Sequence, residues 1–241
     1  MSPVTEFALL HLTTKPPPHD TNTTNTNPLP TPLRETLTTA MRVQDDWHAT
    51  AFPNLPSSSA DRAAVWFSQV EDPAWLLTTA RWPSVAAHWD WIRSAANERV
   101  MGELGPSIVA GETVLFHVAG GIFGKGRGGT GDGGLGSLLE SPVISVRRIF
   151  VKRVDRAAFE AKFEEVRGIL EGYARPHLVR FGWREDVEDG EDEDEFVLVC
   201  GGDSVDQHFA FAESEGFARY GELRELIARV DLKHYKPLSL E

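Results

Sequence analysis

Histidine and aromatic side chains occupy matched places in the two halves of this chain, and these residue types are suited to proton transfer and aromatic contact. Residues 82–92 (WPSVAAHWDWI) and 202–212 (GDSVDQHFAFA) share Ser, Val, His and two aromatic positions at a constant offset. His117 in VLFHV and His234 in DLKHY correspond in the same way. Self-similarity over half of the chain predicts an internal duplication.

Three histidines of the first half, His11, His88 and His117, are candidates for acid–base chemistry. Imidazole titrates near neutral pH, so a histidine in a cavity can act as a general acid or base. Strand alternation places His11 with Phe7, and separately His117, on a face expected to lie between two sheets. His88 lies a little over one turn into the helix after Trp82. A core histidine with satisfied hydrogen bonds is the competing interpretation for each.

Trp82 distinguishes the two halves, because Gly202 stands at the matched position of the second half. We therefore expect a substrate site in the first half, beside Trp82. Large aromatic side chains also fill cores, which is the alternative explanation for the aromatic residues there. The candidate catalytic residues are His88, His117 and His11, and the candidate substrate-binding residues are Trp82, Trp91, Phe7 and Trp66.

Composition restricts the class of protein. The 241 residues carry a net charge of −12, which argues against nucleic acid or anionic lipid as a partner. The one cysteine, Cys200, cannot form an internal disulfide, and its apolar neighbours predict a buried strand position. No apolar run has the length of a membrane span and the first residues do not read as a signal peptide, so we expect a soluble cytoplasmic protein.

The elements that must position these residues follow one order twice: strand, helix, strand, strand, helix, strand. In the first half they are predicted at 4–14, 32–48, 65–71, 75–82, 84–104 and 113–118. In the second half they are predicted at 143–153, around 159–170, and at 177–185, 196–201, 204–227 and 230–235. Each such ferredoxin-like unit leaves one sheet face bare. We therefore expect an α+β fold in which units 1–119 and 143–241, joined by a glycine-rich linker 120–142, pack sheet to sheet as an intrachain barrel.

Two conspicuous segments are interpreted as loops. Residues 124–129 match G-x-G-x-x-G, but more glycine follows where a helix would have to begin, so the match predicts a linker and not a nucleotide site. Residues 185–195 hold nine carboxylates without the spacing of a calcium loop, which predicts a solvated loop. The histidines lack metal-ligand spacing, so neither a metal nor an organic cofactor is predicted.

Residues 4–10 (VTEFALL) followed by residues 82–89 (WPSVAAHW) resemble the antibiotic-biosynthesis monooxygenase (ABM) domain of the dimeric α/β-barrel superfamily. The resemblance covers both halves, as in tandem ABM-domain proteins of filamentous fungi. It implies a dimeric α/β barrel formed within one chain. The superfamily includes cofactor-free oxygenases of aromatic polyketides, polyketide cyclases, haem-degrading enzymes and stress-response proteins.

The resemblance carries over to single residues only in part. Trp82 matches the strand-end tryptophan of the cofactor-free oxygenases, and His88 stands where those enzymes have a tyrosine. Residues 93–98 lack the histidine of the haem-degrading branch, so haem is not expected. The cyclase positions for Tyr and His correspond to Trp91 and Asn97.

The resemblance therefore implies a cofactor-independent, monooxygenase-like tailoring enzyme that acts on an aromatic, polyketide-type small molecule of secondary metabolism. A histidine would remove a phenolic proton, and the resulting carbanion would react with dioxygen. A polyketide cyclase or decarboxylase and a non-catalytic binding or stress-response barrel stay open as alternatives. The chain would work as a monomeric pseudo-dimer or as a homodimer.

Overall fold

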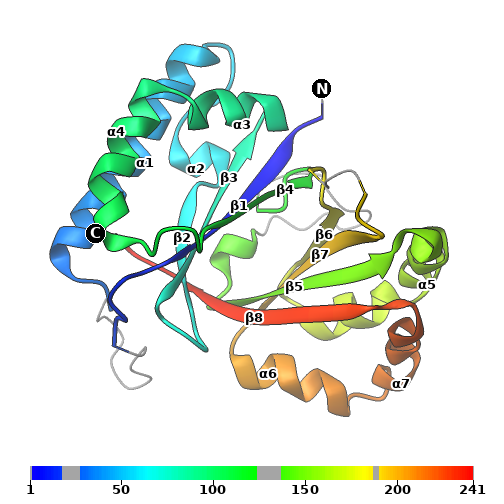
Figure 1. The fold of residues 1–241 in the computed structure, drawn as a ribbon. Coiled ribbons are helices and arrows are strands. Elements are labelled where there is room, and N and C mark those ends of the chain that lie inside the picture. Colours follow the sequence, from blue (N-terminus) through cyan, green and yellow to red (C-terminus); the bar gives the residue numbers. More distant parts are fainter. Residues whose placement is uncertain (1, 18–27, 124–136, 187–189, 241) are drawn as a thin grey trace. The chain divides into compact units, whose positions relative to one another are not determined.

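A computed structural model of the chain describes residues 2–17, 28–123, 137–186 and 190–240 (Figure 1). The described residues form eight strands and seven α-helices, which confirms the α+β class. Contacts divide the chain into two units, residues 1–117 with 235–241 and residues 118–234. The predicted G-x-G-x-x-G loop, residues 124–129, lies outside the described residues, as does much of the predicted linker.

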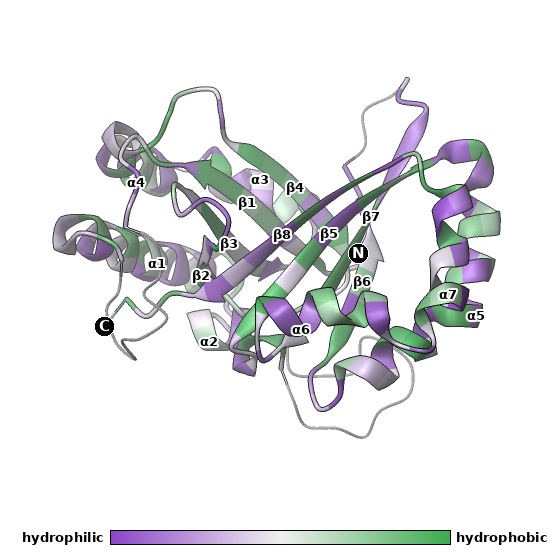
Figure 2. Ribbon diagram, turned by 90° about the horizontal axis from the view of Figure 1, so that it is seen from below, coloured by the Kyte–Doolittle hydropathy of each residue, from purple (hydrophilic) through white to green (hydrophobic). Residues whose placement is uncertain are grey.

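The first unit is a four-stranded sheet whose strands follow the order β4-β1-β3-β2. Its elements are β1 (Val4–His11), α1 (Thr31–Ala51), α2 (Ser59–Arg62), β2 (Val65–Gln69), β3 (Trp75–Trp82), α3 (Val85–Ile92), α4 (Ala95–Leu104) and β4 (Val114–Ala119). Helices α1, α3 and α4 cover one face of this sheet (Figures 1 and 2). Leucines 10, 37, 76 and 104 form part of the core between helices and strands. Strand β1 runs antiparallel to β3, with Val4 opposite Trp82 and His11 opposite Trp75.

Two local features of the first unit differ from the sequence prediction. The helix predicted over 84–104 is two helices, because Ser94 begins a new one by accepting a hydrogen bond from the Asn97 amide at 3.1 Å. Ser84 is the N-cap of α3, and its hydroxyl accepts from the Ala87 amide at 3.2 Å. The short helix α2 was not predicted.

The second unit has the strand order β8-β5-β7-β6. Its elements are β5 (Val143–Lys152), α5 (Arg156–Ala174), β6 (Val179–Trp183), β7 (Glu193–Gly202), α6 (Val205–Ala210), α7 (Phe217–Tyr220) and β8 (Arg229–Pro237). The last residues of β8 pair with β2 and are grouped with the first unit, although the sequence prediction assigned all of 143–241 to the second. Helix α5 lies where a helix was predicted and buries Phe159, Phe163, Val166 and Leu170. Figure 2 shows that it carries both hydrophobic and hydrophilic residues.

The helix predicted over 204–227 is instead a series of short pieces. Helices α6 and α7 are joined and followed by 3₁₀ turns at Phe211–Glu213 and Gly221–Leu226. Gly216 permits this course, since a Cβ there would lie 2.3 Å from the Ile169 side chain of α5. A longer side chain would push the segment away from α5.

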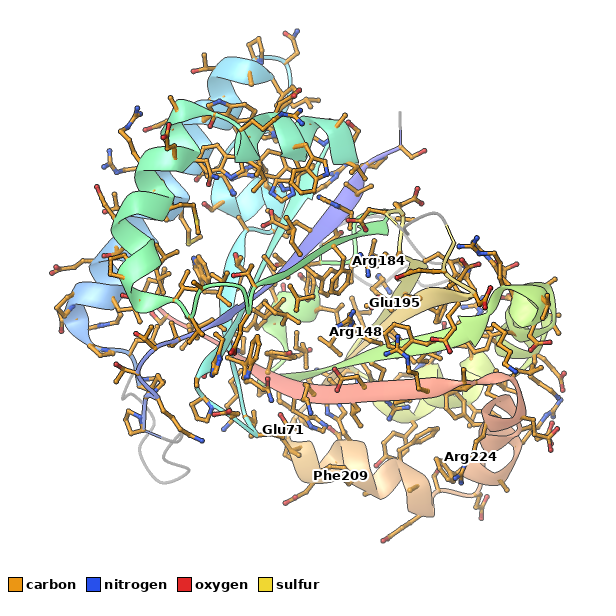
Figure 3. The ribbon with its side chains drawn as sticks, viewed as in Figure 1. Glu71, Arg148, Arg184, Glu195, Phe209 and Arg224 are labelled. Atoms are coloured by element: carbon orange, nitrogen blue, oxygen red, sulfur yellow. The ribbon has the colours of Figure 1, made fainter. Side chains whose placement is uncertain are left out.

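The prediction that residues 185–195 form a solvated loop is wrong at the C-terminal end of the run. Asp194 and Glu195 lie in β7 and are buried. Glu195 accepts from Arg148 Nε at 2.5 Å and Nη2 at 3.0 Å, and from Arg184 Nη1 at 3.2 Å (Figure 3). Arg148 of β5 and Arg184, the residue after β6, neutralise Glu195, and Arg153 and Arg156 pair with Asp194, which local composition does not reveal. Residues 187–189 lie outside the described residues.

Two expectations from composition concern Cys200 and membrane helices. Cys200 is buried in β7, as predicted, and burial raises the pKa of its thiol to about 11. Within the described part of the chain, no helix has both the length and the apolar character needed to cross a membrane.

Candidate functional site

Four polar side chains form a buried chain in the core of the first unit. Trp82 Nε1 donates to Glu6 Oε2 at 2.7 Å, and His88 Nε2 lies 3.3 Å from the same oxygen. His88 Nδ1 and His117 Nε2 are joined by a hydrogen bond of 2.7 Å. Glu6 is 5% exposed, and the other three residues are 0% exposed. These four side chains are therefore almost completely removed from water.

Strand register and a helix cap together create this chain. Val4 is opposite Trp82, so Glu6, two residues further along β1, is a diagonal neighbour of Trp82 on the same face. Ser84 begins α3 immediately after β3, and one turn later the His88 ring stacks on the Trp82 indole at 4.5 Å. The arrangement thus follows from an eight-residue strand, a Pro-Ser turn and one helical turn.

The Glu6 carboxyl has an unusual acidity. Burial raises its pKa from 4.5 to about 7, and the hydrogen bond from Trp82 and the charges of His117 and Arg62 oppose that rise. A carboxyl with this pKa gains or loses a proton near neutral pH. The ionised form of Glu6 accepts the hydrogen bond from Trp82, and burial disfavours that form.

The cluster of Glu6, His88 and His117 is not arranged as a metal site. The two imidazoles bond directly to one another, which engages one nitrogen of each ring. Across residues 2–17, 28–123, 137–186 and 190–240, no group of three His, Cys, Asp or Glu side chains is placed to hold a metal ion.

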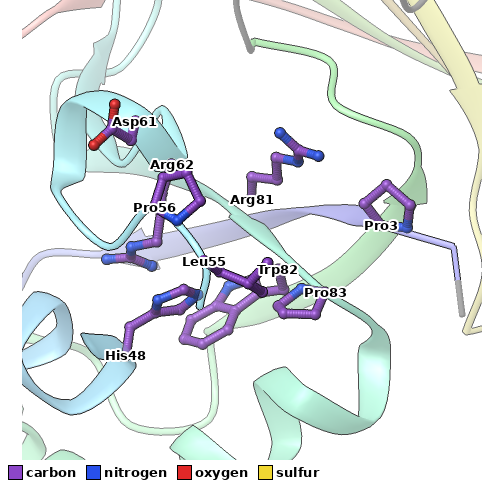
Figure 4. Close-up of a pocket in the computed structure, with 9 residues that line it drawn as sticks. All are labelled: Pro3, His48, Leu55, Pro56, Asp61, Arg62, Arg81, Trp82 and Pro83. Atoms are coloured by element: carbon purple, nitrogen blue, oxygen red, sulfur yellow. The ribbon is translucent and has the colours of Figure 1, made fainter. Parts of the chain in front are cut away.

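An open cavity of about 240 Å³ lies beside Trp82 in the same unit (Figure 4). Leu55 and Pro56 are exposed at its edge, and the indole of Trp82 forms part of its wall. The lining residues are Pro3, His48, Leu55, Pro56, Asp61, Arg62, Arg81, Trp82 and Pro83. The exposed apolar surface of this lining comes from Leu55, Pro56 and Pro83, since Trp82 is fully buried.

Arg62, the last residue of α2, is fixed on one side of this cavity and is only 2% exposed. Its Nε donates to Ser57 O at 3.2 Å, and its Nη2 donates to Gln44 Oε1 at 2.9 Å and Asp45 Oδ1 at 2.5 Å. The guanidinium carbon lies 5.4 Å from the centre of the Trp82 ring. These contacts hold a positive charge next to the indole.

His48, from α1, is the one histidine that lines this cavity. Its ring centre lies 5.7 Å from that of Trp82, and Figure 4 shows its imidazole beside the Arg62 guanidinium. Burial and the Arg62 charge lower its pKa from 6.5 to about 4. His48 is therefore neutral at physiological pH.

Several residues predicted from the sequence lie near one another in the first unit. Trp82, His88 and His117 form the buried chain, and Trp91 packs 5.5 Å from Trp47, which is 6.3 Å from Trp82. Neither His88 nor His117 lines the cavity. Their predicted catalytic role stays a prediction.

Three other predicted residues lie apart from this chain. His11 is at the opposite end of β1, where it stacks on Trp75 at 4.6 Å and pairs with Glu112. His11 is seven positions along the strand from Val4, so their Cα atoms are roughly 23 Å apart. Trp66 belongs to the leucine-rich core around Leu76, and Phe7 stacks on Phe116 at 5.2 Å. Alternation identified the strand face of His11 but not its distance from Trp82.

Sequence reasoning missed Glu6, His48 and Arg62. A carboxylate within the apolar strand VTEFALL was a visible signal for Glu6. His48 continues the helical spacing that begins at Leu33, so it falls on the buried face of α1. Arg62 had no comparable signal, because a four-residue helix shows no periodicity.

No model of a protein family and no curated protein sequence matches the chain. Its fold is similar to solved structures. An anthrone oxidase-like protein has 12% identity and a TM-score of 0.58, covering 99% of this chain and 92% of that one. A "putative monooxygenase" from Lactobacillus acidophilus has 9% identity and a TM-score of 0.53, covering 98% and 94%. The chlorite dismutase of Candidatus Nitrospira defluvii in complex with imidazole has 13% identity and a TM-score of 0.57, covering 98% and 91%. At these identities the likeness shows the fold alone.

Proposed function

We propose that the chain is a monooxygenase-like enzyme that acts on an aromatic, polyketide-type small molecule of secondary metabolism without an organic cofactor or metal. One observation carries the proposal: the Trp82 indole lines an open cavity while its N–H group bonds the buried Glu6–His88–His117 chain. The names of the monooxygenase and anthrone oxidase-like neighbours support the reaction class, although the same fold also occurs in chlorite dismutase.

The proposed reaction needs no external reductant. A phenolic ring beside an activated CH₂ group loses a proton to a base, and the electron-rich carbanion adds dioxygen to give C–OO⁻. Protonation gives C–OOH, which loses water together with the second C–H proton. The balance is R₂CH₂ + O₂ → R₂C=O + H₂O, in which the carbon gives up four electrons and dioxygen accepts four.

The cavity assigns the roles differently from the sequence prediction. His48 is the histidine that lines the cavity, so in this proposal it receives the phenolic proton, and the phenolate that forms beside it raises its lowered pKa by opposing the Arg62 charge. His88 and His117 act from behind Trp82 as positioning residues, since they hold the indole and Glu6. Trp82 forms the wall that excludes water from the anion.

The tandem ABM-like organisation is part of the same proposal. In each unit a serine caps the helix after the third strand, Ser84 for α3 and Ser204 for α6. Four residues later in each helix a buried histidine meets a histidine of the last strand, His88 with His117 and His208 with His234. A shared construction of this kind supports two copies of one ancestral unit.

Oxygen uptake with 1,8-dihydroxyanthrone, an anthrone with phenolic hydroxyl groups, as the test substrate, with mass analysis of the product, tests the function. We expect one dioxygen consumed per ketone formed, and a loss of about 100-fold or more in His48→Gln. The matched control is His11→Gln, the same change in the same unit, which should keep the wild-type rate. No oxygen uptake with 1,8-dihydroxyanthrone or related phenols, or equal rates in the two variants, would overturn the proposal.

The absorbance spectrum of the purified protein tests the cofactor-independent part separately. We expect only the protein band of tryptophan and tyrosine. A flavin band or a Soret band that co-purifies with activity would contradict it.

A further inference from the structure

Trp82 belongs to a cluster of aromatic rings that leads from the core of the first unit toward its surface. The centre of its ring lies 6.3 Å from that of Trp47, which in turn lies 5.5 Å from that of Trp91. Both separations correspond to direct ring contact. Trp82 and Trp91 are buried, whereas Trp47 of α1 is half-buried and reaches solvent. An electron can therefore pass between the surface and the Trp82 indole through Trp47.

The N–H group of this buried indole is bonded to a proton acceptor. Trp82 Nε1 donates to Glu6 Oε2 at 2.7 Å, and the two side chains lie together in the core. Hydrogen bonds to an ionised carboxylate are shorter and stronger than those between neutral groups. An indole that has lost an electron is a far stronger acid than indole itself. The bond to Glu6 is therefore a direct path for the N–H proton when the ring is oxidised.

Burial determines which oxidised form of Trp82 the core can hold. Loss of an electron alone would leave a positive charge on a fully buried ring, which is costly. The Arg62 guanidinium carbon, 5.4 Å from the ring centre, adds to that cost, although Asp45 offsets part of its charge.

Transfer of the proton to Glu6 avoids the buried positive charge. It leaves a neutral indolyl radical beside a neutral carboxyl group, so the negative charge of the buried carboxylate also disappears. Burial raises the pKa of Glu6 to about 7, which means that the core already favours the protonated carboxyl. Loss of the electron together with the proton is thus the oxidation that this environment supports.

We propose that Trp82 is a redox-active residue that reduces oxygen-centred radicals, giving up one electron while its N–H proton passes to Glu6 along their hydrogen bond. The oxidant is a radical of the alkoxyl class, RO•, and the step is RO• + Trp82–H + Glu6–COO⁻ → RO⁻ + Trp82• + Glu6–COOH. The radical oxygen gains the electron, the indole N–H bond breaks, and an O–H bond forms on Glu6. A thiolate in solution restores Trp82 by giving an electron through Trp47 and becoming a thiyl radical, while the proton returns from Glu6.

This second activity goes beyond the proposed oxygenation, and only the source of the radical rests on the proposed function. The hydroperoxide C–OOH of that reaction releases an alkoxyl radical when its O–O bond breaks homolytically. Trp82 lies in the wall of the cavity, so its electron reaches such a radical over a short distance without contact with solvent. The residue would thus protect the neighbouring side chains from radical attack.

Flash photolysis of the full chain tests the proposal without substrate. The probe is photogenerated tris(bipyridine)ruthenium(III), a one-electron oxidant too large to enter the core, and visible absorbance distinguishes neutral from cationic tryptophan radicals. Above pH 7, where Glu6 is largely ionised, we expect a neutral radical that outlives those of exposed tryptophans, because its ring is shielded from solvent. Trp82→Phe should abolish this long-lived signal, and Trp47→Phe should slow its formation several-fold. Trp75→Phe, at the other end of β3, is the matched control and should leave it unchanged.

The proton acceptor is tested by Glu6→Gln, which can bond the indole but takes no proton from it. We expect a cationic, shorter-lived radical in this variant, and a slower oxidation in heavy water for the wild-type chain, a measurement that needs no variant to fold. Absence of a long-lived neutral radical in the wild type, or its persistence in Trp82→Phe or Glu6→Gln, would overturn the proposal. A neutral radical at Trp82 without oxygen uptake would contradict the proposed function but not this inference, and oxygen uptake without that radical would do the reverse.

Discussion

The two units share one plan and differ at the positions that make a site. Both place a capped helix after the third strand, and both pair a helix histidine with a histidine of the last strand. In the first unit a tryptophan and a glutamate complete the group, Trp82 and Glu6. At the corresponding register positions the second unit has Gly202 and Ser145, since Val143 is opposite Gly202 as Val4 is opposite Trp82.

The difference is also steric. A Cβ on Gly202 would lie 2.6 Å from His208 Nε2, so the second histidine occupies the place where an indole would begin. His208 is buried, and burial lowers its pKa to about 4. The second unit thus has a buried histidine pair without an indole beside it, which indicates that the shared Ser, Val and His serve the common fold. The residues that are not shared are the ones that line or support the cavity.

Removing the indole that distinguishes the units should have the largest effect. Trp82→Ala truncates a fully buried ring and leaves Glu6 without its N–H donor, so we expect a loss of about 3–5 kcal/mol in unfolding free energy. Trp89→Ala, a partly exposed tryptophan of α3, is the control and should cost below ~1 kcal/mol. Chemical denaturation measures both free energies of unfolding. Equal losses of stability in the two variants would mean that Trp82 does not contribute to the core.

The carboxyl that only the first unit has should give a pH-dependent difference. Between pH 4.5 and 7 folded Glu6 keeps a proton that the unfolded chain has lost, so wild-type stability falls as the pH rises through this window. Glu6→Gln cannot titrate, so its stability relative to wild type should increase by up to about 3 kcal/mol from pH 4.5 to pH 7.

Denaturant titrations at several pH values measure that difference, in which all other groups cancel. Ser145→Ala changes the matched position of the second unit and should show no such slope. A flat difference for Glu6→Gln would contradict the raised pKa.

The steric difference is tested by adding one methyl group to the second unit. Gly202→Ala should destabilise by about 1–3 kcal/mol, because the new Cβ overlaps His208 Nε2. His208→Ala should relieve much of that loss in the double variant. Gly172→Ala in α5 is the control: its Cβ meets nothing within 4 Å, so it should be stabilising by up to about 1 kcal/mol. Additive losses in the double variant would show that His208 is not the obstacle.

The shared helix caps should give the smallest effect, and an equal one. Ser84→Ala and Ser204→Ala each remove a hydroxyl that accepts an amide hydrogen bond, at 3.2 Å and 3.1 Å. Each should cost about 1 kcal/mol in thermal or chemical unfolding. A much larger loss at one cap would break the equivalence of the two units.

The features that the two units share could be predicted from the sequence more completely than the residues that differ between them. Repeated Ser-Val-His spacing located the capped helices and the matched histidines, because local patterns determine caps and strand alternation. Glu6 and Arg62 escaped, since their roles depend on a diagonal contact across strands and on a helix too short to show a period. Asp194 and Glu195 escaped for a related reason, as their arginine partners come from distant parts of the chain.

Oxygen uptake by two equivalent variants tests most directly whether the site belongs to the first unit alone. His88→Gln and His208→Gln change the same helix position of each unit. We expect His88→Gln to lower the rate with 1,8-dihydroxyanthrone by about tenfold or more and to shift the pH profile of kcat, because Glu6 loses its histidine neighbour. His208→Gln should keep the wild-type rate and profile. Equal losses in the two variants, or loss in His208→Gln alone, would contradict a site in the first unit alone.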